Sequence, residues 1–365
     1  MHKLLLGQLR PGTTISADMY DTSGRLLLKK GTVLTPRVLQ MLRSGNSNFV
    51  YLNLPPSNHI MPPRPLPETA EPPPVSIEVR RAATQQIKKC WEQVEKTGLL
   101  QDITPLRQTA EQIAGEILTH PSPLVSLAQI RLYDDYLFAH SVDVAILAVL
   151  TGTALRMNKK TLVQLGLGGL LHDIGKIRVP REILNKPGRL TAEEFSIIKK
   201  HTVHAGEILR GYDSRLVAIA TQHHERVDGS GYPYGLHGRA IDPLAQIVSI
   251  ADVFDAMTTD RVYRPALPVH EVVEYLLGSG GQHFELTYIN AFLQNIAAFP
   301  VGSTVRLCSG AMAIVQRNRR GLPLYPLVRV LTDKNGRPVE PYELDLLQAR
   351  LTISAVLNGT DKNSD

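Results

Sequence analysis

The stretch LGLGGLLHDIGK, residues 165–176, largely decides the fold of this chain and the chemistry that it can support. Its apolar, glycine-rich beginning predicts a buried helix that approaches its neighbours closely, because glycine has no side chain. His172 and Asp173 follow at once, where an ionisable side chain without a partner would be costly. A carboxylate such as Asp173 can bridge two cations, and the neighbouring imidazole can bind one of them. The alternative is a helix end that is capped by Asp173 and Gly175.

Further side chains of the kind that binds metals occur on both sides of this stretch. They are His140, His201, the run His223–His224–Glu225, and Asp252. His140 lies at the edge of an apolar segment, where a single histidine is more often a core residue with one hydrogen bond than a metal ligand. Asp252 lies in an apolar run, residues 247–257, in which an unpaired aspartate would be destabilising. A metal ion would compensate this charge, and Asp255, one turn later, is expected to support the site by hydrogen bonding.

The adjacent histidines His223 and His224 give the sharpest local signal. Neighbouring residues of a helix point about 100° apart, so both imidazoles can bind metal only if the ions lie between the two directions. Two exposed histidines at a helix end are the alternative.

His201 lies in a segment that opens with a capping box at residues 191–194, which predicts a helix. The apolar stripe of this helix comprises Phe195, Ile198, Ala205 and Ile208. His201 lies on the stripe and His204 lies one turn further on, so spacing alone does not choose between them as a ligand.

Together with the loop DGSGYP at residues 228–233, these motifs resemble the HD-GYP family from residue 131 to residue 292. The resemblance implies an all-helical HD-type catalytic domain that hydrolyses cyclic di-GMP at a cluster of two or three metal ions. It assigns one ion to His140, His172, Asp173 and Asp252, and a second ion, bridged by Asp173, to His201, His223 and His224. It selects His201 over His204, which is kept as a candidate supporting residue, and it places Ala205 where glycine is usual.

The number and kind of ions follow from the same comparison of residues. Tyr136 stands where members with three metals have a glutamate, and tyrosine does not readily bind a third ion, so we expect two divalent ions. The predicted ligands offer nitrogen and oxygen but no thiolate, which indicates iron, manganese, nickel or zinc rather than a structural zinc site. Family precedent favours iron or manganese.

The resemblance also assigns roles around the ions. Asp173 and Lys176 are the predicted catalytic residues, and Lys176 is expected to contact the scissile phosphate or the attacking oxygen, where negative charge develops. Tyr232 is a predicted substrate contact. Gly229 and Gly231 allow the loop to turn tightly beside the metals.

Two arginines downstream complete the predicted substrate contacts. Arg261 and Arg264 lie one turn apart and suit phosphate or guanine edges, with surface ion pairing as the alternative. Residues 282–285 read QHFE where the family usually has a Phe-Asp-Pro motif, which leaves the closing element of the resemblance open.

The predicted function is therefore that of a phosphodiesterase that opens cyclic di-GMP with a metal-bridged hydroxide as the nucleophile, with pGpG as the product and GMP as the alternative final product. One alternative is a cyclic di-GMP receptor with little turnover, against which the intact Lys176 and the complete ligand set argue. Another is a nucleotide phosphohydrolase of the wider HD superfamily, which the Gly231–Tyr232–Pro233 motif disfavours. Cyclic GMP-AMP stays open as a substrate.

Composition limits the class of protein and its partners. The chain has 365 residues, of which 43% are hydrophobic, and only two cysteines, so we expect a globular cytoplasmic protein without a disulfide framework. Its apolar runs are too short to span a membrane. The net charge of +6 suggests an anionic partner, but aromatic residues make up only 5% and nucleic acid is not expected.

The fold class expected is mainly α, with the helical HD-type domain between small β-rich N-terminal and C-terminal modules. The expected parts are a β-rich module at 1–54, a proline-rich linker at 55–75, the helical domain at 76–298, a β appendage at 299–357 and a tail at 358–365. Predicted helices occupy residues 35–42, 79–94 and 106–118, and predicted strands occupy 26–28, 48–52, 305–307, 313–315 and 327–331. The helices at 79–94 and 106–118 support a homodimer, transmit a signal or pack onto the following domain.

Overall fold

The computed structural model describes residues 2–5, 15, 18–20, 26–43, 49–53, 73–120, 136–186, 188–260 and 266–357. The chain divides into two compact units, Met1–Glu71 and Pro72–Asp365. Most of the predicted linker and the whole predicted tail lie outside the described residues. Within the described part, no helix combines the length and the apolar character needed to cross a membrane.

The first unit contains four short strands and one helix among its described residues. The strands β1 (His2–Leu5), β2 (Asp18–Tyr20), β3 (Leu26–Leu28) and β4 (Phe49–Asn53) pair antiparallel in the order β1-β4-β2-β3. Helix α1 (Pro36–Arg43) begins as the sequence predicts, because the hydroxyl of Thr35 accepts a hydrogen bond of 3.3 Å from the backbone N–H of Val38. Ile15, Met19, Leu34, Leu39 and Leu42 form the core of this unit.

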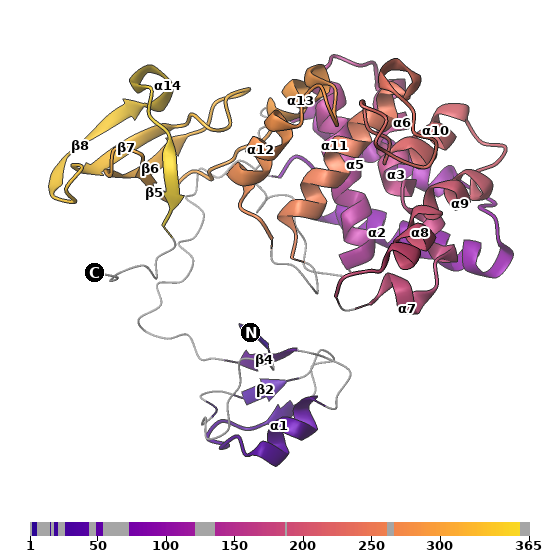
Figure 1. Cartoon of the computed structure of the whole chain (residues 1–365), viewed down its shortest axis with the longest axis horizontal. Coiled ribbons are helices and arrows are strands. Elements are labelled where there is room, and N and C mark those ends of the chain that lie inside the picture. The colour runs from indigo at the N-terminus through magenta and orange to yellow at the C-terminus, as the bar shows by residue number, and fades with distance from the viewer. Residues whose placement is uncertain are drawn as a thin grey trace. The chain divides into compact units, whose positions relative to one another are not determined.

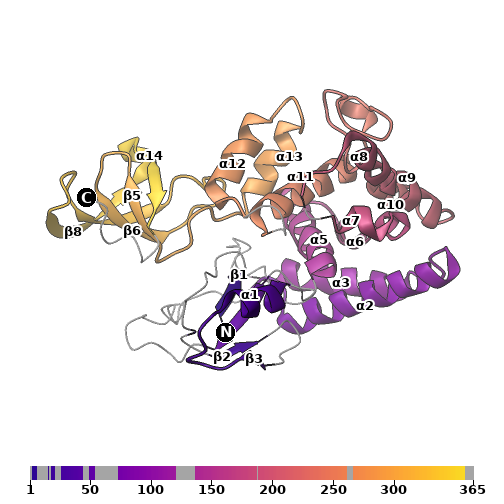
Figure 2. The same cartoon turned by 60° about the horizontal axis from the view of Figure 1, so that its bottom comes forward.

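The second unit is built around α5 (Tyr136–Ala154), which α2 (Ile77–Thr97), α3 (Thr104–Thr119), α6 (Lys159–Leu171), α11 (Pro243–Thr258) and α13 (Leu286–Leu293) contact (Figure 1). Every residue from His140 to Leu150 is buried, as the nearly continuous apolar sequence requires. Helices α2 and α3 run side by side against this core (Figure 2). The helices predicted at 79–94 and 106–118 are therefore confirmed, and both pack onto the domain.

Glycines allow α6 to pack against α5 at very short distance. A Cβ atom added to Gly169 would lie 2.5 Å from the Cα of Ala145, and one added to Gly168 would lie 2.5 Å from the side chain of Ile219. The predicted close approach of this helix is confirmed, and it brings the end of α6 next to the middle of α5.

The segment after the capping box is one helix in the prediction but two in the structure. Thr191 and Glu194 form the predicted capping box, and α8 (Ala192–Lys199) is followed directly by α9 (His201–Ile208). Lys200 lies between the two helices, and α8 has no buried residue, so the predicted common stripe is wrong. Ala205 and Ile208 are buried, whereas Phe195 has 43% of its surface exposed.

Shorter elements connect these helices. They are η2 (Ile174–Arg178), α7 (Arg181–Leu184), α10 (Ser214–Gln222), η3 (Gly238–Ala240) and α12 (Val269–Gly278).

A five-stranded antiparallel sheet follows the helices, in the order β8-β7-β6-β5-β9. Its strands are β5 (Thr304–Leu307), β6 (Met312–Arg317), β7 (Leu327–Thr332), β8 (Pro338–Asp345) and β9 (Ile353–Val356), with the short helix α14 (Leu346–Ala349) before the last strand. The three strands predicted here are confirmed as β5, β6 and β7. The sequence did not predict β8, which contains two prolines and mostly exposed residues, so it lacks a buried alternating pattern.

Candidate metal centre

Five separate segments bring the seven predicted ligands to one place. His140 lies in α5 and Asp252 in α11, whereas the other five follow or begin helices at their ends. These are His172 and Asp173 after α6, His201 at the start of α9, and His223 and His224 after α10. Six of the seven are buried and His224 is partly exposed, so the cluster lies inside the helical domain with one side open.

The two carboxylate oxygens of Asp173 face two different groups of histidines. Oδ2 lies 3.3 Å from Nε2 of His172 and 4.0 Å from Nε2 of His140. Oδ1 lies 3.4 Å from Nε2 of His201 and 3.9 Å from Nε2 of His223. A carboxylate placed in this way can bind one cation with each oxygen.

The remaining carboxylate, Asp252, closes the first of these groups. Its Oδ1 lies 3.1 Å from Nε2 of His140 and 3.9 Å from Nε2 of His172, and its Oδ2 lies 3.9 Å from Nδ1 of His224. In the second group, Nε2 of His201 and Nε2 of His223 are 3.4 Å apart.

Backbone carbonyl groups fix the orientation of three imidazole rings. Nδ1 of His172 donates to the carbonyl of Gly169 at 2.8 Å, and Nδ1 of His201 donates to that of Ile198 at 2.7 Å. Nδ1 of His223 likewise donates to the carbonyl of Ala220 at 3.1 Å. When the proton of a neutral imidazole is on Nδ1, Nε2 is unprotonated and its lone pair is available. Histidine binds metals in this neutral form.

Two polar atoms in the centre of the cluster are buried and have no hydrogen-bond partner in the described part of the chain. They are Nε2 of His172 and Oδ1 of Asp173. Buried polar atoms are almost always satisfied, and these two are a nitrogen and an oxygen that a cation would take as ligands. The residues present therefore fit divalent metal ions.

The charges of the cluster suit cation binding. Burial by itself raises the pKa of Asp173, but Lys176 and His172 hold that pKa well below its usual range, and His140 and His172 do the same for Asp252. Burial lowers the pKa of His201 to about 4, and burial together with His224 lowers that of His223. At neutral pH the carboxylates are ionised and these imidazoles are neutral.

His140 differs from the other histidines, and this predicts proton release on metal binding. Burial alone would lower its pKa, but hydrogen bonds to Asp252 and Asp255 raise it to about 10, so at pH 8 the metal-free ring is protonated. A cation that binds Nε2 must displace this proton, so we expect release of about one proton per chain at pH 8, and tighter binding as the pH rises toward 10. Titration calorimetry with Mn²⁺ in buffers of different ionisation enthalpy measures both, and a pH-independent affinity would contradict the prediction.

Residues next to the cluster support it. Nδ1 of His140 lies 2.6 Å from Oδ2 of Asp255, so Asp255 occupies the supporting place predicted for it. Nζ of Lys176 lies 2.5 Å from Oδ2 of Asp173, and 22% of the lysine side chain is exposed. The lysine thus places a positive charge at the open side of the cluster. His204 lies apart from the ligands, with Nδ1 at 3.6 Å from a carboxylate oxygen of Glu207.

The loop at residues 228–233 is tied to the same histidines. The ring of Tyr232 stacks on that of His224 with 4.7 Å between their centroids. A Cβ atom on Gly231 would lie 2.4 Å from the backbone nitrogen of Arg226, and one on Gly229 would lie 2.0 Å from the ring of His237. Both glycines are therefore required by close contacts, as the sequence predicts.

Glu225 is a supporting residue whose role sequence reasoning missed. It is buried, and its two carboxylate oxygens accept hydrogen bonds of 2.7 Å and 3.0 Å from the backbone N–H groups of Tyr234 and Leu236. It thereby fixes the loop beside His223 and His224. The only signal in the sequence was an acidic residue directly after a histidine pair.

The unusual segment at 282–285 contacts the loop through its backbone. The carbonyls of Gln282 and His283 accept hydrogen bonds of 2.8 Å and 3.2 Å from the N–H groups of Asp228 and Val227. Because backbone carbonyls make these contacts, the departure from the usual family motif does not remove them.

Three predicted features lie beyond what the structure describes. Arg261 and Arg264 fall in residues 261–265, which are outside the described residues, and so does the side chain of Tyr136. The substrate contacts of the two arginines and the absence of a third ion therefore stay predictions.

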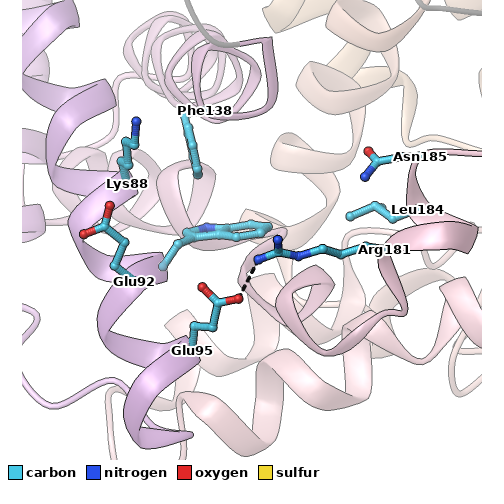
Figure 3. Close-up of a pocket in the computed structure, with 8 residues that line it drawn as sticks. Lys88, Glu92, Glu95, Phe138, Arg181, Leu184 and Asn185 are labelled. Carbon is cyan, nitrogen blue, oxygen red and sulfur yellow. Dashed lines mark hydrogen bonds and ion pairs between the residues drawn. The ribbon is translucent and has the colours of Figure 1, made fainter. Parts of the chain in front are cut away.

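A surface pocket of about 300 Å³ lies between α2, α5 and α7, and none of its lining residues belongs to the cluster (Figure 3). Trp91 lies against Phe138 in an edge-to-face contact with 5.5 Å between ring centroids. Arg181 of α7 pairs with Glu95 of α2 at 2.6 Å across the pocket. These two contacts join α2 to α5 and α7.

Two family models match parts of this chain. The family model described as "HD domain" matches residues 116–287, and the model "KOW domain associated with HD domain" matches residues 304–364. A cyclic di-GMP phosphodiesterase of Pseudomonas aeruginosa is 34% identical over 261 residues, which cover 70% of this chain and 63% of the relative.

Two further relatives show the range of proteins with this likeness. A 3'3'-cGAMP-specific phosphodiesterase of Vibrio cholerae is 42% identical over 143 residues, covering 39% of this chain and 33% of the relative. A solved HDG"Y"P protein from Bdellovibrio bacteriovorus gives a TM-score of 0.49 at 20% identity, covering 80% of this chain and 97% of that one. The chain thus spans less than two thirds of the length of the phosphodiesterases that it matches.

Proposed function

This chain belongs to the HD-GYP family of HD domain proteins, and from that membership we propose that it is a metal-dependent phosphodiesterase that opens cyclic di-GMP to pGpG. One observation carries the proposal. The oxygens of Asp173 face two groups of histidines, and backbone bonds at Nδ1 leave Nε2 of His172, His201 and His223 as lone pairs directed into the cluster.

We propose two ions with the predicted ligands. His140, His172, Asp173 and Asp252 hold one, and Asp173, His201, His223 and His224 hold the other. The ligand atoms of the second set lie close together, and so do those of His140, His172 and Asp173 in the first. Asp252 joins the first set through its Oδ1, which lies 3.1 Å from Nε2 of His140. The nitrogen and oxygen ligands suit iron or manganese, with zinc or nickel as alternatives. When bound, such a pair of ions supplies a water of lowered pKa as the nucleophile and neutralises the phosphodiester.

The chain's own side chains then bind and orient the substrate. Lys176 lies at the open side of the cluster, where its ammonium group can interact with a phosphate oxygen and stabilise the charge that develops during attack. The ring of Tyr232 stacks on His224, and Tyr232 contacts the dinucleotide in this proposal. Arg261 and Arg264 follow α11, which carries Asp252, and we propose that they bind phosphate or a guanine edge.

The remaining proposals concern the rest of the chain. Residues 1–54 form a β-rich module of their own, joined by the proline-rich linker to the catalytic domain. Cys90 and Cys308 are free, which supports a cytoplasmic location.

The test is an assay of the full-length protein loaded with Mn²⁺ or Fe²⁺. We expect cyclic di-GMP to be converted to pGpG, detected by liquid chromatography, with no product after the metal is removed by chelation. 3'3'-cGAMP is assayed in parallel, because a relative specific for it shares 42% identity over part of the chain. Faster turnover of cyclic GMP-AMP would change the substrate assigned, and stoichiometric binding without product would favour the receptor alternative.

A further inference from the structure

A buried ion pair joins α2 to the helix that carries His140. Arg80 of α2 pairs with Asp143 of α5, and their side chains are only 5% and 7% exposed. Helix α2 precedes residues 116–287, which match the HD domain. A fully buried arginine is rare in a protein and needs a specific partner, so this pair calls for a structural explanation.

The pair lies next to the proposed metal centre, because Asp143 is on the same helix as His140. Asp143 follows His140 by three residues on α5, so the two side chains lie on adjacent parts of one helix face. Burial, and after it the charge of Asp255, raises the pKa of Asp143 to about 8, while the guanidinium of Arg80 lowers it. Asp255 in turn binds Nδ1 of His140 at 2.6 Å.

The charges around His140 explain what the arginine does. Three buried carboxylates surround this histidine, namely Asp143, Asp252 and Asp255. Arg80 supplies a guanidinium to Asp143, which leaves Asp255 as the acceptor that orients the ring of His140. Without the guanidinium, Asp143 would be a buried carboxyl group that has lost its partner, one helical turn from His140.

We propose that Arg80 is a positioning residue for the ion held by His140, acting through Asp143 and Asp255. The inference rests on the proposed metal centre, and it extends the centre to a helix that lies outside the HD domain match. Some residues do not bind the metal themselves but fix the orientation of its ligands. Replacing such a residue typically weakens metal binding about 10- to 100-fold.

Other contacts hold α2 in place without Arg80, so a variant is expected to fold. The backbone N–H and the hydroxyl of Ser76 donate to the carboxylate of Glu116 at 2.7 Å and 2.8 Å. Trp91 packs on Phe138, and Arg178 donates to the carbonyl of Gly98 at 2.9 Å. These contacts extend from one end of α2 to the other.

The experiment compares Arg80→Met with Arg81→Met in the full-length protein. Arg81 is the next residue on the same helix but is exposed, so it controls for loss of one positive charge. Metal content per chain and Mn²⁺ affinity are measured for both. We expect Arg81→Met to bind two ions as the wild type does, and Arg80→Met to bind one of them about 10- to 100-fold more weakly.

A double variant separates the electrostatic path from packing of α2. Arg80→Met combined with Asp143→Leu removes both members of the pair, so no buried carboxyl group is left without its partner and most of the wild-type affinity should return. If the double variant binds as weakly as Arg80→Met, the path through Asp143 is wrong. If Arg80→Met retains two ions at wild-type affinity, even with a lower melting temperature, the role is merely structural and the inference is overturned. A wild-type protein that binds no metal would contradict the proposed function instead.

Discussion

Asp173→Ala should abolish hydrolysis of cyclic di-GMP, with a loss of roughly 1,000-fold or more, and should lower the bound metal. The reason is geometric, because each oxygen of this carboxylate faces a different pair of histidines and its removal takes one ligand from both ions. Turnover of the metal-loaded protein and metal content by mass spectrometry are the two measurements.

Asp102→Ala is the matched control for this variant. Asp102 is an exposed aspartate before α3 that accepts a hydrogen bond from the N–H of Thr104. We expect it to keep full metal content and activity. An Asp173→Ala protein that stays active with two ions per chain would show that the two-ion mechanism is wrong.

Gly175→Ala should disrupt the contact between η2 and α9, which carry catalytic and ligand residues. A Cβ atom at this position would lie 1.9 Å from the carbonyl oxygen of His201 and 2.6 Å from the nitrogen of Ala205. Both neighbours are backbone atoms, so the two segments must separate and move His201 away from Asp173. We expect the free energy of unfolding to fall by about 3 kcal/mol or more, together with loss of the second ion.

Gly115→Ala in α3 is the control for a glycine without such contacts. A Cβ atom there meets nothing within 4 Å, so alanine should leave stability unchanged or raise it by up to about 1 kcal/mol. Chemical denaturation and metal content are measured for both variants. A Gly175→Ala protein with wild-type stability and two ions would contradict the close packing of η2 on α9.

Local signals explain why so much of the fold could be predicted from sequence. The capping box at 191–194 and the cap at Thr35 depend on residues three apart, and both form as predicted. The seven proposed ligands also come together, because the family resemblance supplied the long-range information that spacing lacks.

Features that depend on distant partners could not be predicted. Arg80 and Asp143 are 63 residues apart, and nothing near Arg80 in the sequence indicates that it is buried. Phe195 is exposed although its spacing is typical of the apolar stripe of one helix, which the structure divides at Lys200. Strand β9 pairs with β5, which lies more than 40 residues earlier in the sequence. The four residues of β9 are too few to show a clear pattern by themselves.

The backbone bonds of the imidazole rings have a consequence for how variants of this site are interpreted. Each carbonyl that accepts from Nδ1 of His172 or His223 is one of those left unpaired at the end of a helix, so the ring also serves as the C-terminal cap of α6 or α10. Substituting either histidine therefore destabilises a helix C-terminus and also removes a proposed metal ligand. Inactivity after such an exchange is evidence of metal ligation only when the apoprotein keeps its melting temperature.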